Sequence, residues 1–201
     1  MLVLKLGGSV ITDKRVRCRA RPGVIGRLAR ELKPFCSETI IVHGAGSFGH
    51  IKASKHGLKD GISSDEALLG AAEVQREVRE LDAIVCRALQ KAGIPAISIP
   101  PSVFLQFSCG SLSEYDVGPF REAMARGFVP VTFGDVVMDD LQGVAICSGD
   151  DLVKLLACEF KAERAVFVSD VDGIFDSDPK ANKRAKLIRE IDPLKPLKAV
   201  M

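Results

Sequence analysis

The sequence has no cysteine pair at metal-binding spacing, no long apolar run and almost no net charge. Its six cysteines are scattered without a C-x-x-C pair, which argues against a zinc site and against a disulfide framework. Its apolar runs are only a few residues long, far short of the roughly 18–20 residues that a membrane span requires. Lys5, with Gly7 and Gly8, also interrupts what could have been the apolar region of a signal peptide. We therefore expect a cytoplasmic protein.

An excess of charge of one sign is also missing. The chain has 28 Lys and Arg residues against 26 Asp and Glu residues, a formal net charge of +2. This balance gives no general attraction to nucleic acid or to a membrane surface, so any anion must be recognised locally. The composition, 47% hydrophobic and 27% charged, is that of an ordinary globular protein. With 201 residues and no repeat, low-complexity tract or linker, the chain is expected to form a single domain, residues 1–201.

Short β-branched apolar runs alternate with longer helical patterns, which is typical of βαβ units around a mostly parallel sheet. Strands are predicted at Met1–Leu6, Thr39–Val42, Ala96–Ile99, Val129–Thr132 and Ala165–Val168. Helices are predicted from Pro22 to Pro34, at Ser64–Ala92, around Pro119–Ala125 and at Asp151–Phe160. The predicted fold class is therefore α/β.

Two glycine-rich turns follow the first two strands. They are Lys5–Ser9, with the sequence K-L-G-G-S, and His43–His50, with the sequence H-G-A-G-S-F-G-H. Glycine lets backbone N–H groups approach an anion closely, so phosphate is the natural ligand of such turns. The second turn has the G-x-G-x-x-G spacing of dinucleotide-binding folds, but that fingerprint normally follows the first strand. A Walker A loop is excluded, because Gly-Lys occurs nowhere in the chain.

Three side chains near these turns are candidates for phosphate chemistry. Lys5 lies between Leu4 and Leu6, so its ammonium group is expected at the carboxyl end of the strand, where it could neutralise a transferring phosphoryl group. The alternative is a lysine that points to solvent from an edge strand. His43 and His50 lack a third ligand for a metal. We expect one histidine to pack at the strand end and the other, His50, to donate a hydrogen bond to phosphate.

Five cations lie within a short segment before the first helix: Lys14, Arg15, Arg17, Arg19 and Arg21. A nucleic-acid-binding tail is disfavoured, because no aromatic side chains interleave with the cations to stack on bases. Two interpretations remain open, a solvated loop and a cationic flap beside a phosphate site.

Two acidic stretches come later in the chain. Cys147–Asp151 opens a helix, and Ser169–Pro179 follows a strand with the sequence S-D-V-D-G-I-F-D-S-D-P. Carboxylates at the carboxyl ends of parallel strands can hold lysines in place or meet Mg²⁺-bound phosphates. Asp and Gly are also ordinary turn and cap residues, so each taken singly has a plain structural explanation.

Together these motifs resemble the amino acid kinase family. The family shows K-x-G-G-S, a glycine-rich turn after the second strand, a G-D-D helix start and a D-V-D-G run ending in D-P, and all occur here in order from Lys5 to Pro179. Within the family, the loop His43–His50 and the sequence I-T-D-K at Ile11–Lys14 are similar to those of isopentenyl phosphate kinases. The resemblance implies a three-layer αβα sandwich, a homodimer, and ATP with Mg²⁺ as cofactors.

The resemblance also implies roles for individual residues. Catalytic roles would fall to Lys5, Lys14, His50 and Asp150, with Asp150 orienting the lysines. The residues that would hold ATP are Lys5, Gly7, Gly8, Ser9, Gly46, Ser169, Asp170, Phe175 and Asp178. The residues that would bind the acceptor substrate are Ala45, His50 and Gly149. No side chain is assigned to a metal. The expected reaction is phosphorylation of isopentenyl phosphate to isopentenyl diphosphate, a step of isoprenoid biosynthesis.

One departure from the family pattern concerns the end of the sequence. We expect residues of about 1–150 to bind substrate and about 151–201 to form an incomplete ATP-binding part, because no G-G-x-x-x-K stretch follows Pro179. Lys195 or Lys198 could supply the missing charge. Two alternatives stay open at this point, a kinase for a fosfomycin-type phosphonate and a catalytically inactive phosphate or nucleotide binder.

Overall fold

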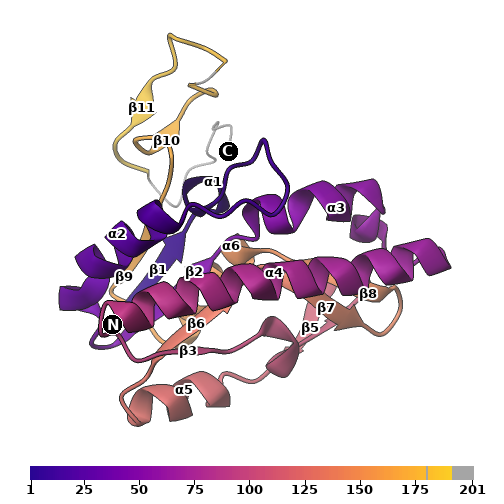
Figure 1. Ribbon diagram of the computed structural model, residues 1–201, viewed down its shortest axis with the longest axis horizontal. Coiled ribbons are helices and arrows are strands. Elements are labelled where there is room, and N and C mark those ends of the chain that lie inside the picture. The colour runs from indigo at the N-terminus through magenta and orange to yellow at the C-terminus, as the bar shows by residue number, and fades with distance from the viewer. Residues whose placement is uncertain (180, 192–201) are drawn as a thin grey trace. The chain divides into compact units, whose positions relative to one another are not determined.

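The computed structural model describes residues 1–179 and 181–191, and these form two compact units (Figure 1). The first unit is Met1–Val168 and the second is Ser169–Met201. The expected division near residue 150 concerns ligand binding and stays a prediction. Lys195 and Lys198 lie outside the described residues.

A five-stranded parallel sheet forms the centre of the first unit, with strand order β3-β6-β2-β1-β9. The strands are β1 (Leu2–Leu6), β2 (Thr39–His43), β3 (Ala96–Ser98), β6 (Val129–Phe133) and β9 (Arg164–Val168). All five occupy the predicted segments. The central strands β2 and β6 are buried along their whole length, which explains why they are continuous apolar runs in the sequence.

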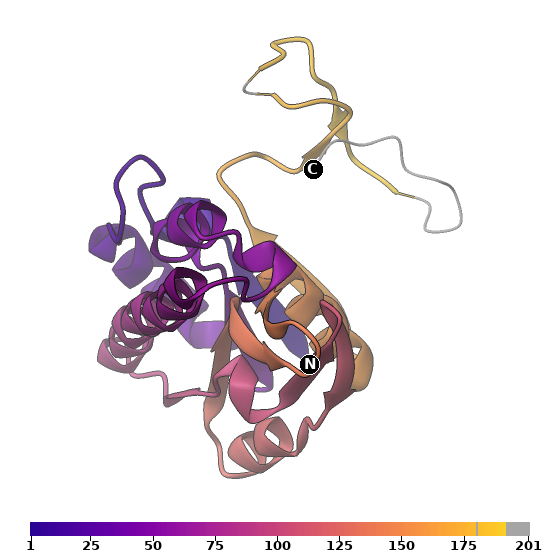
Figure 2. The same ribbon diagram turned by 90° about the vertical axis from the view of Figure 1, so that its right-hand side faces the viewer.

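Helices cover both faces of this sheet (Figures 1 and 2). The helices α2 (Pro22–Leu32) and α4 (Asp65–Lys91) pack on the face that carries Leu4, Leu6 and Ile41. The helices α5 (Gly118–Ala125) and α6 (Gly149–Glu159) pack on the face that carries Val3, Ile40 and Val42. Odd and even positions of each strand thus face opposite layers, as strand geometry requires. The predicted α/β fold with helices on both sides of a parallel sheet is confirmed.

The longest helix, α4, begins and ends where its sequence predicts. The side chain of Ser64 accepts a hydrogen bond from the backbone N–H of Ala67, and Asp65 and Glu66 lie in the first turn, where the helix dipole favours negative charge. Gly93 follows the helix with a φ of +81°, the left-handed conformation that commonly terminates helices.

A second, four-stranded sheet was not predicted. Its strands are β4 (Leu105–Ser108), β5 (Ser111–Tyr115), β7 (Asp135–Asp139) and β8 (Gly143–Cys147), in the order β5-β4-β7-β8. The strand β5 is exposed along its whole length, so its sequence shows no apolar alternation. The buried carboxylate of Asp139 holds both hairpin turns, because it accepts backbone N–H groups from Cys109, Gly110, Leu141 and Gln142.

Several short elements connect the layers of the first unit, and the second unit contains one hairpin. The short elements are α1 (Gly8–Ile11), η1 (Lys33–Phe35), η2 (Gly46–Phe48), α3 (His50–Lys55), η3 (Leu58–Asp60) and η4 (Pro101–Val103). The hairpin pairs β10 (Ile174–Phe175) with β11 (Leu187–Ile188) in antiparallel register.

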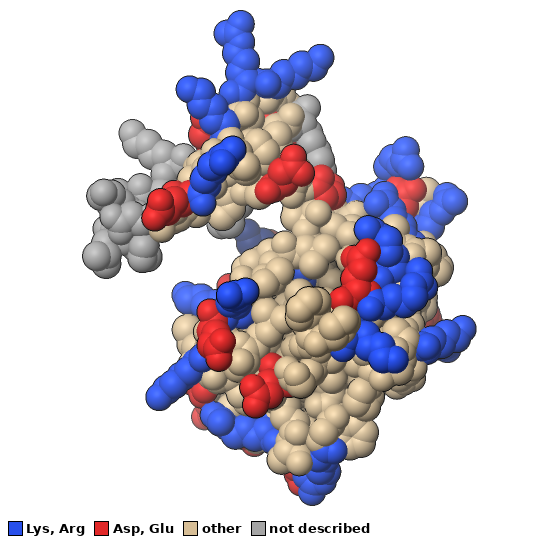
Figure 3. Space-filling view, turned by 90° about the vertical axis from the view of Figure 1, so that its left-hand side faces the viewer, with Lys and Arg blue, Asp and Glu red and all other residues tan. Residues whose placement is uncertain are grey.

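The surface mixes charges of both signs. On the face of the first unit shown in Figure 3, Lys and Arg lie among Asp and Glu around uncharged surface, without a continuous field of one sign. Of the helices in the described residues, none has the length and apolar character needed to cross a bilayer.

The burial of α4 predicts that replacing two leucines of this helix will change the free energy of unfolding by very different amounts. Leu81 has no exposed surface, whereas Leu69 is 63% exposed. Leu81→Ala should lower the free energy of unfolding by about 2–5 kcal/mol, because it leaves a cavity between helix and sheet. Leu69→Ala should change it by less than about 0.5 kcal/mol. Urea unfolding followed by circular dichroism measures both, and equal losses would contradict the packing described here.

Candidate phosphate-binding site

The two glycine-rich turns pack against each other, backbone on backbone. A Cβ atom on Gly8 would lie 2.7 Å from the Cα atom of Gly46, and one on Gly44 would lie 2.9 Å from the backbone nitrogen of Gly8. Gly7 is equally confined, because a Cβ atom there would lie 2.7 Å from the carbonyl oxygen of Val168 on the neighbouring strand β9, which accepts a 2.9 Å hydrogen bond from the Gly7 N–H. Only glycine allows this approach, so the glycines bring the ends of β1 and β2 together.

Thr12 joins the two turns through its hydroxyl group. The hydroxyl donates to the carbonyl oxygen of Gly8 at 2.6 Å and accepts from the backbone N–H of Ser47 at 3.0 Å. Gly46, just before Ser47, has a φ of +51°, which L side chains rarely adopt. Thr12 lies inside the I-T-D-K motif but was not among the predicted site residues.

Lys5 and Asp150 form an ion pair beside these turns. Lys5 faces the layer of α6, because it alternates with Leu4 and Leu6, and its Nζ lies 2.6 Å from Oδ1 of Asp150. Asp150 lies in the first turn of α6, which the Ser148 side chain caps. The Lys5 ammonium also lies 5.8 Å from the centre of the Phe167 ring. The Lys5 side chain is mostly buried, so it does not point freely into solvent.

Gly149 lies between this ion pair and the second glycine-rich turn. A Cβ atom there would lie 3.6 Å from Cε of Lys5 and 3.3 Å from the carbonyl oxygen of His43. The N-terminus of α6 therefore reaches the carboxyl ends of β1 and β2, the edge of a parallel sheet where ligands commonly bind.

His50 lies at the start of α3, directly after the second glycine-rich turn, where part of its side chain reaches solvent and part of the ring is covered. Partial burial of the ring lowers the pKa of His50 below its ordinary value, and the charges of Lys14 and Lys5 act in the same direction. Lys14 itself is exposed and, among the described residues, makes no ion pair.

His43, at the other end of the same turn, has a different environment. It is fully buried, its ring stacks on Phe133 with ring centres 5.1 Å apart, and its Nε2 atom lies 3.3 Å from Oδ1 of Asp82. The prediction that one histidine packs at the strand end is confirmed, and His43 is the histidine in that position. No group of three or more potential metal-ligating side chains occurs within the described residues.

Ten of the predicted site residues lie in the first unit, on the two glycine-rich turns, the loop that follows α1, the start of α3 and the start of α6. They are Lys5, Gly7, Gly8, Ser9, Lys14, Ala45, Gly46, His50, Gly149 and Asp150. Their individual roles stay predictions.

The other four predicted residues, Ser169, Asp170, Phe175 and Asp178, belong to the second unit. Phe175 lies in β10 opposite Leu187, and the carbonyl oxygen of Asp178 accepts the N–H groups of Ala181 and Asn182. The Ser169 hydroxyl accepts the N–H of Val171 at 3.4 Å. Their assignment to the nucleotide also stays a prediction.

Comparison with known proteins identifies the class to which this site belongs. The model of the amino acid kinase family matches residues 1–199. The chain is 40% identical over 192 residues to isopentenyl phosphate kinase from Thermoplasma acidophilum, which covers 96% of this chain and 76% of that protein. It is 36% identical to isopentenyl phosphate kinase from Methanothermobacter thermautotrophicus, covering 100% of this chain and 78% of that protein.

The fold gives the same answer. A solved isopentenyl phosphate kinase structure matches with a TM-score of 0.90 and 38% identity, covering 96% of this chain and 81% of that one. The chain therefore belongs to the amino acid kinase family. It is a kinase, an enzyme class that uses ATP, and within the family its similar relatives include isopentenyl phosphate kinases. The resemblance drawn from the sequence motifs is confirmed.

The contact between the two turns predicts that Gly46 tolerates no side chain. Gly46→Ala forces a residue at positive φ to place its Cβ atom 2.8 Å from the carbonyl oxygen of Gly8. Gly57→Ala is the matched control, because Gly57 also has positive φ but has open space around the Cβ position. We expect Gly46→Ala to lower stability by more than the roughly 1 kcal/mol typical of backbone strain alone, and to weaken ATP binding.

Thermal unfolding and calorimetric titration with ATP measure the two effects. If Gly46→Ala behaved like Gly57→Ala in both measurements, the turns would not depend on their close backbone contact.

Proposed function

We propose that the chain transfers the γ-phosphoryl group of ATP to isopentenyl phosphate and forms isopentenyl diphosphate. The observation that carries this proposal is the position of His50 at the start of α3, directly after the second glycine-rich turn, which packs backbone on backbone against the turn that follows Lys5. A relative named isopentenyl phosphate kinase is 40% identical over 192 residues, 96% of the chain, which supports the choice of acceptor.

On the acceptor side, His50 would donate a hydrogen bond to the phosphate of the substrate. Its lowered pKa leaves the imidazole neutral at neutral pH in the free protein, with one N–H available as a donor. A bound phosphate would offset the two lysine charges and favour the protonated ring, which strengthens the interaction. On the same side, the backbone at Ala45 and Gly149 would approach the substrate closely. Lys14 would provide a second cation for its phosphate.

On the donor side, Lys5, Gly7, Gly8, Ser9 and Gly46 would surround the phosphates of ATP. An oxygen of the acceptor phosphate attacks the γ-phosphorus atom, the bond from that atom to the bridging oxygen of ADP breaks, and ADP leaves. Such a transfer depends on alignment and on fixed positive charge more than on covalent chemistry.

The ion pair between Lys5 and Asp150 would keep the lysine aimed at the transferring group. In the second unit, we assign Ser169, Asp170, Phe175 and Asp178 to the adenine nucleotide on the basis of the family resemblance.

Mg²⁺ fits this site only as part of the nucleotide. The described residues offer no cluster of carboxylates that could form a protein cage, and Mg²⁺ is commonly bound mainly by substrate phosphates with one or two carboxylates. Asp150 is the carboxylate at the site that could approach it. When bound, the ion would neutralise phosphate charge.

The family resemblance also implies a homodimer.

ADP release by the purified chain tests the reaction directly. With ATP and Mg²⁺, we expect release with isopentenyl phosphate and none with fosfomycin, with UMP or without an acceptor. Selective release with fosfomycin would assign a phosphonate kinase instead. No release of ADP with any acceptor would indicate a binding protein without kinase activity.

Replacing His50 tests the acceptor site. His50→Ala removes a hydrogen bond to a charged group, a loss of about 1.5–3 kcal/mol, so kcat/KM for isopentenyl phosphate should fall about ten-fold to a hundred-fold. The KM for ATP should stay unchanged. Lys55→Ala, an exposed substitution at the far end of the same short helix, is the control. Unchanged efficiency in His50→Ala would remove His50 from the acceptor site.

A further inference from the structure

A buried carboxylate lies on α4, away from the ion pair of Lys5 and Asp150. Glu77 is 1% exposed, although it stands among the apolar positions Val74, Val78 and Leu81 that pack against the rest of the fold. A charged group in such a position is costly unless it is paired and hydrogen-bonded. The partners of Glu77 must therefore compensate for the cost of burying its charge.

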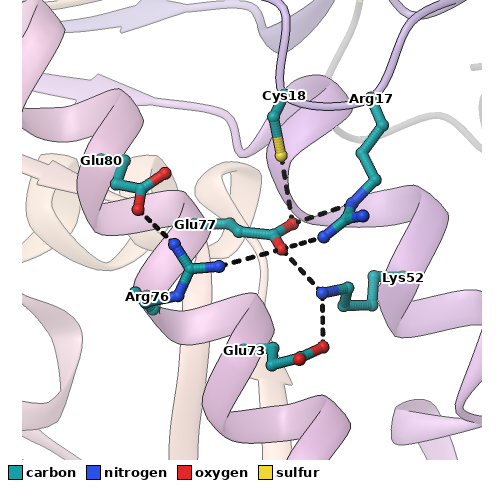
Figure 4. Close-up of polar contacts among 7 residues, drawn as sticks. All are labelled: Arg17, Cys18, Lys52, Glu73, Arg76, Glu77 and Glu80. Carbon is teal, nitrogen blue, oxygen red and sulfur yellow. Dashed lines mark hydrogen bonds and ion pairs between the residues drawn. The ribbon is translucent and has the colours of Figure 1, made fainter.

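Glu77 contacts side chains from three separate segments (Figure 4). Arg17, from the loop after α1, binds both carboxylate oxygens through its guanidinium group. Lys52, from α3, places its Nζ atom 2.7 Å from Oε1 of Glu77 and also pairs with Glu73. Arg76, on α4 itself, places its Nη2 atom 3.4 Å from Oε1 of Glu77.

The thiol of Cys18 completes this set by donating to Oε2 of Glu77 at 3.2 Å. Burial alone raises the pKa of Glu77, but the hydrogen bonds from Arg17, Lys52 and Cys18 outweigh it and lower the pKa to about 2. The carboxylate is therefore ionised at neutral pH and can pair with the cations around it.

The loop that Glu77 holds is the one that carries Lys14. It is closed by the bridge between Thr12 and Ala20, and by a 2.8 Å hydrogen bond from the N–H of Asp13 to the carbonyl oxygen of Arg19. Cys18 has a φ of +52°, an unfavourable conformation for a residue with a side chain. Its N–H donates to the carbonyl oxygen of Ser47 in the second glycine-rich turn at 3.1 Å. Contacts with Glu77 and with that turn thus fix the strained part of the loop.

The helix that Glu77 holds is the one that begins with His50. Lys52 lies two residues after His50 in the short helix α3, which has only six residues and little stability of its own. One carboxylate therefore fixes both segments that present the candidate acceptor groups, Lys14 and His50.

We propose that Glu77 is a positioning residue for the acceptor phosphate, because it joins the loop of Lys14 to the helix of His50. This inference rests on the proposed function and extends it to a residue that does not touch the substrate. Without this link, Lys14 and His50 keep their chemistry but lose their fixed separation, so binding of the phosphate has to order them first.

Two arginines that both contact Glu77 give a matched test. Arg17 and Arg76 have similarly exposed side chains, 53% and 58%, but only Arg17 belongs to the loop, whereas Arg76 lies on the same helix as Glu77. In Arg17→Met, Glu77 keeps Lys52 and Arg76 as partners, so the fold should persist. We expect Arg17→Met to raise the KM for isopentenyl phosphate about ten-fold and to leave the KM for ATP unchanged. Arg76→Met should change either KM less than two-fold.

Three outcomes would overturn the role of Glu77. These are an unchanged KM for isopentenyl phosphate in Arg17→Met, a parallel rise of both KM values, and equal effects in Arg17→Met and Arg76→Met. As a second variant, Glu77→Gln should speed hydrogen exchange of the backbone amides of Cys18 and Arg19, while Glu80→Gln should not. Unchanged exchange in Glu77→Gln would show that the carboxylate does not anchor the loop.

Calorimetry without ATP separates this inference from the proposed reaction. If the wild-type chain binds isopentenyl phosphate or inorganic phosphate but releases no ADP, the proposed reaction fails, and weaker binding in Arg17→Met still supports the role of Glu77. If the wild-type chain binds neither ligand, both proposals fail. If it is active and Arg17→Met binds the monophosphate as tightly as wild type, only the inference about Glu77 fails.

Discussion

The approach of two backbone turns without side chains between them is the constraint on which the site depends. Gly8 lies against Gly44 and Gly46 at distances that no Cβ atom allows, and Gly7 hydrogen-bonds to Val168 on the next strand. Three neighbouring strands of a parallel sheet therefore end at nearly the same place. Lys5 and the N-terminus of α6 reach this place from one layer, and Thr12 connects the turns. A side chain at Gly8 would separate the two turns and the elements that meet beside them.

Most of the central fold could be predicted because its signals are local. The five strands of the parallel sheet are short apolar runs, and the helices that cover the sheet show apolar periodicity or a proline in the first turn, with side-chain caps at α4 and α6. The second sheet could not be predicted in the same way. Its strand β5 has no buried face, and β4 joins β7 through the single register pair of Phe107 with Asp139. The turns of both hairpins also depend on Asp139, which accepts four of their backbone N–H groups, an arrangement that exists only in the folded chain.

The candidate site, too, could be predicted from the sequence only in part. Glycine motifs and the order of the strands predict that Lys5, the two turns and the start of α6 share one edge of the sheet. The sequence also contains a signal for Glu77, because a glutamate at a position three or four residues from Val74 and Leu81 must lie on the buried face of its helix. The sequence contains no comparable signal for the partners of Glu77. Arg17 is 60 residues away and Lys52 is 25 residues away, so only the packing of the loop and α3 against α4 brings them together.

The same packing explains how a nearly neutral chain can present local positive charge. A run of cations would repel itself if each member faced solvent, but here most members have a partner within the fold: Arg15 pairs with Asp13, and Arg17 with Glu77. Arg21 donates to the carbonyl oxygen of Ser9. These contacts fix the backbone that carries Lys14, which remains exposed. The cationic segment is thus a structured loop beside the glycine-rich turns, in which Arg15, Arg17 and Arg21 contact the fold and Lys14 stays exposed.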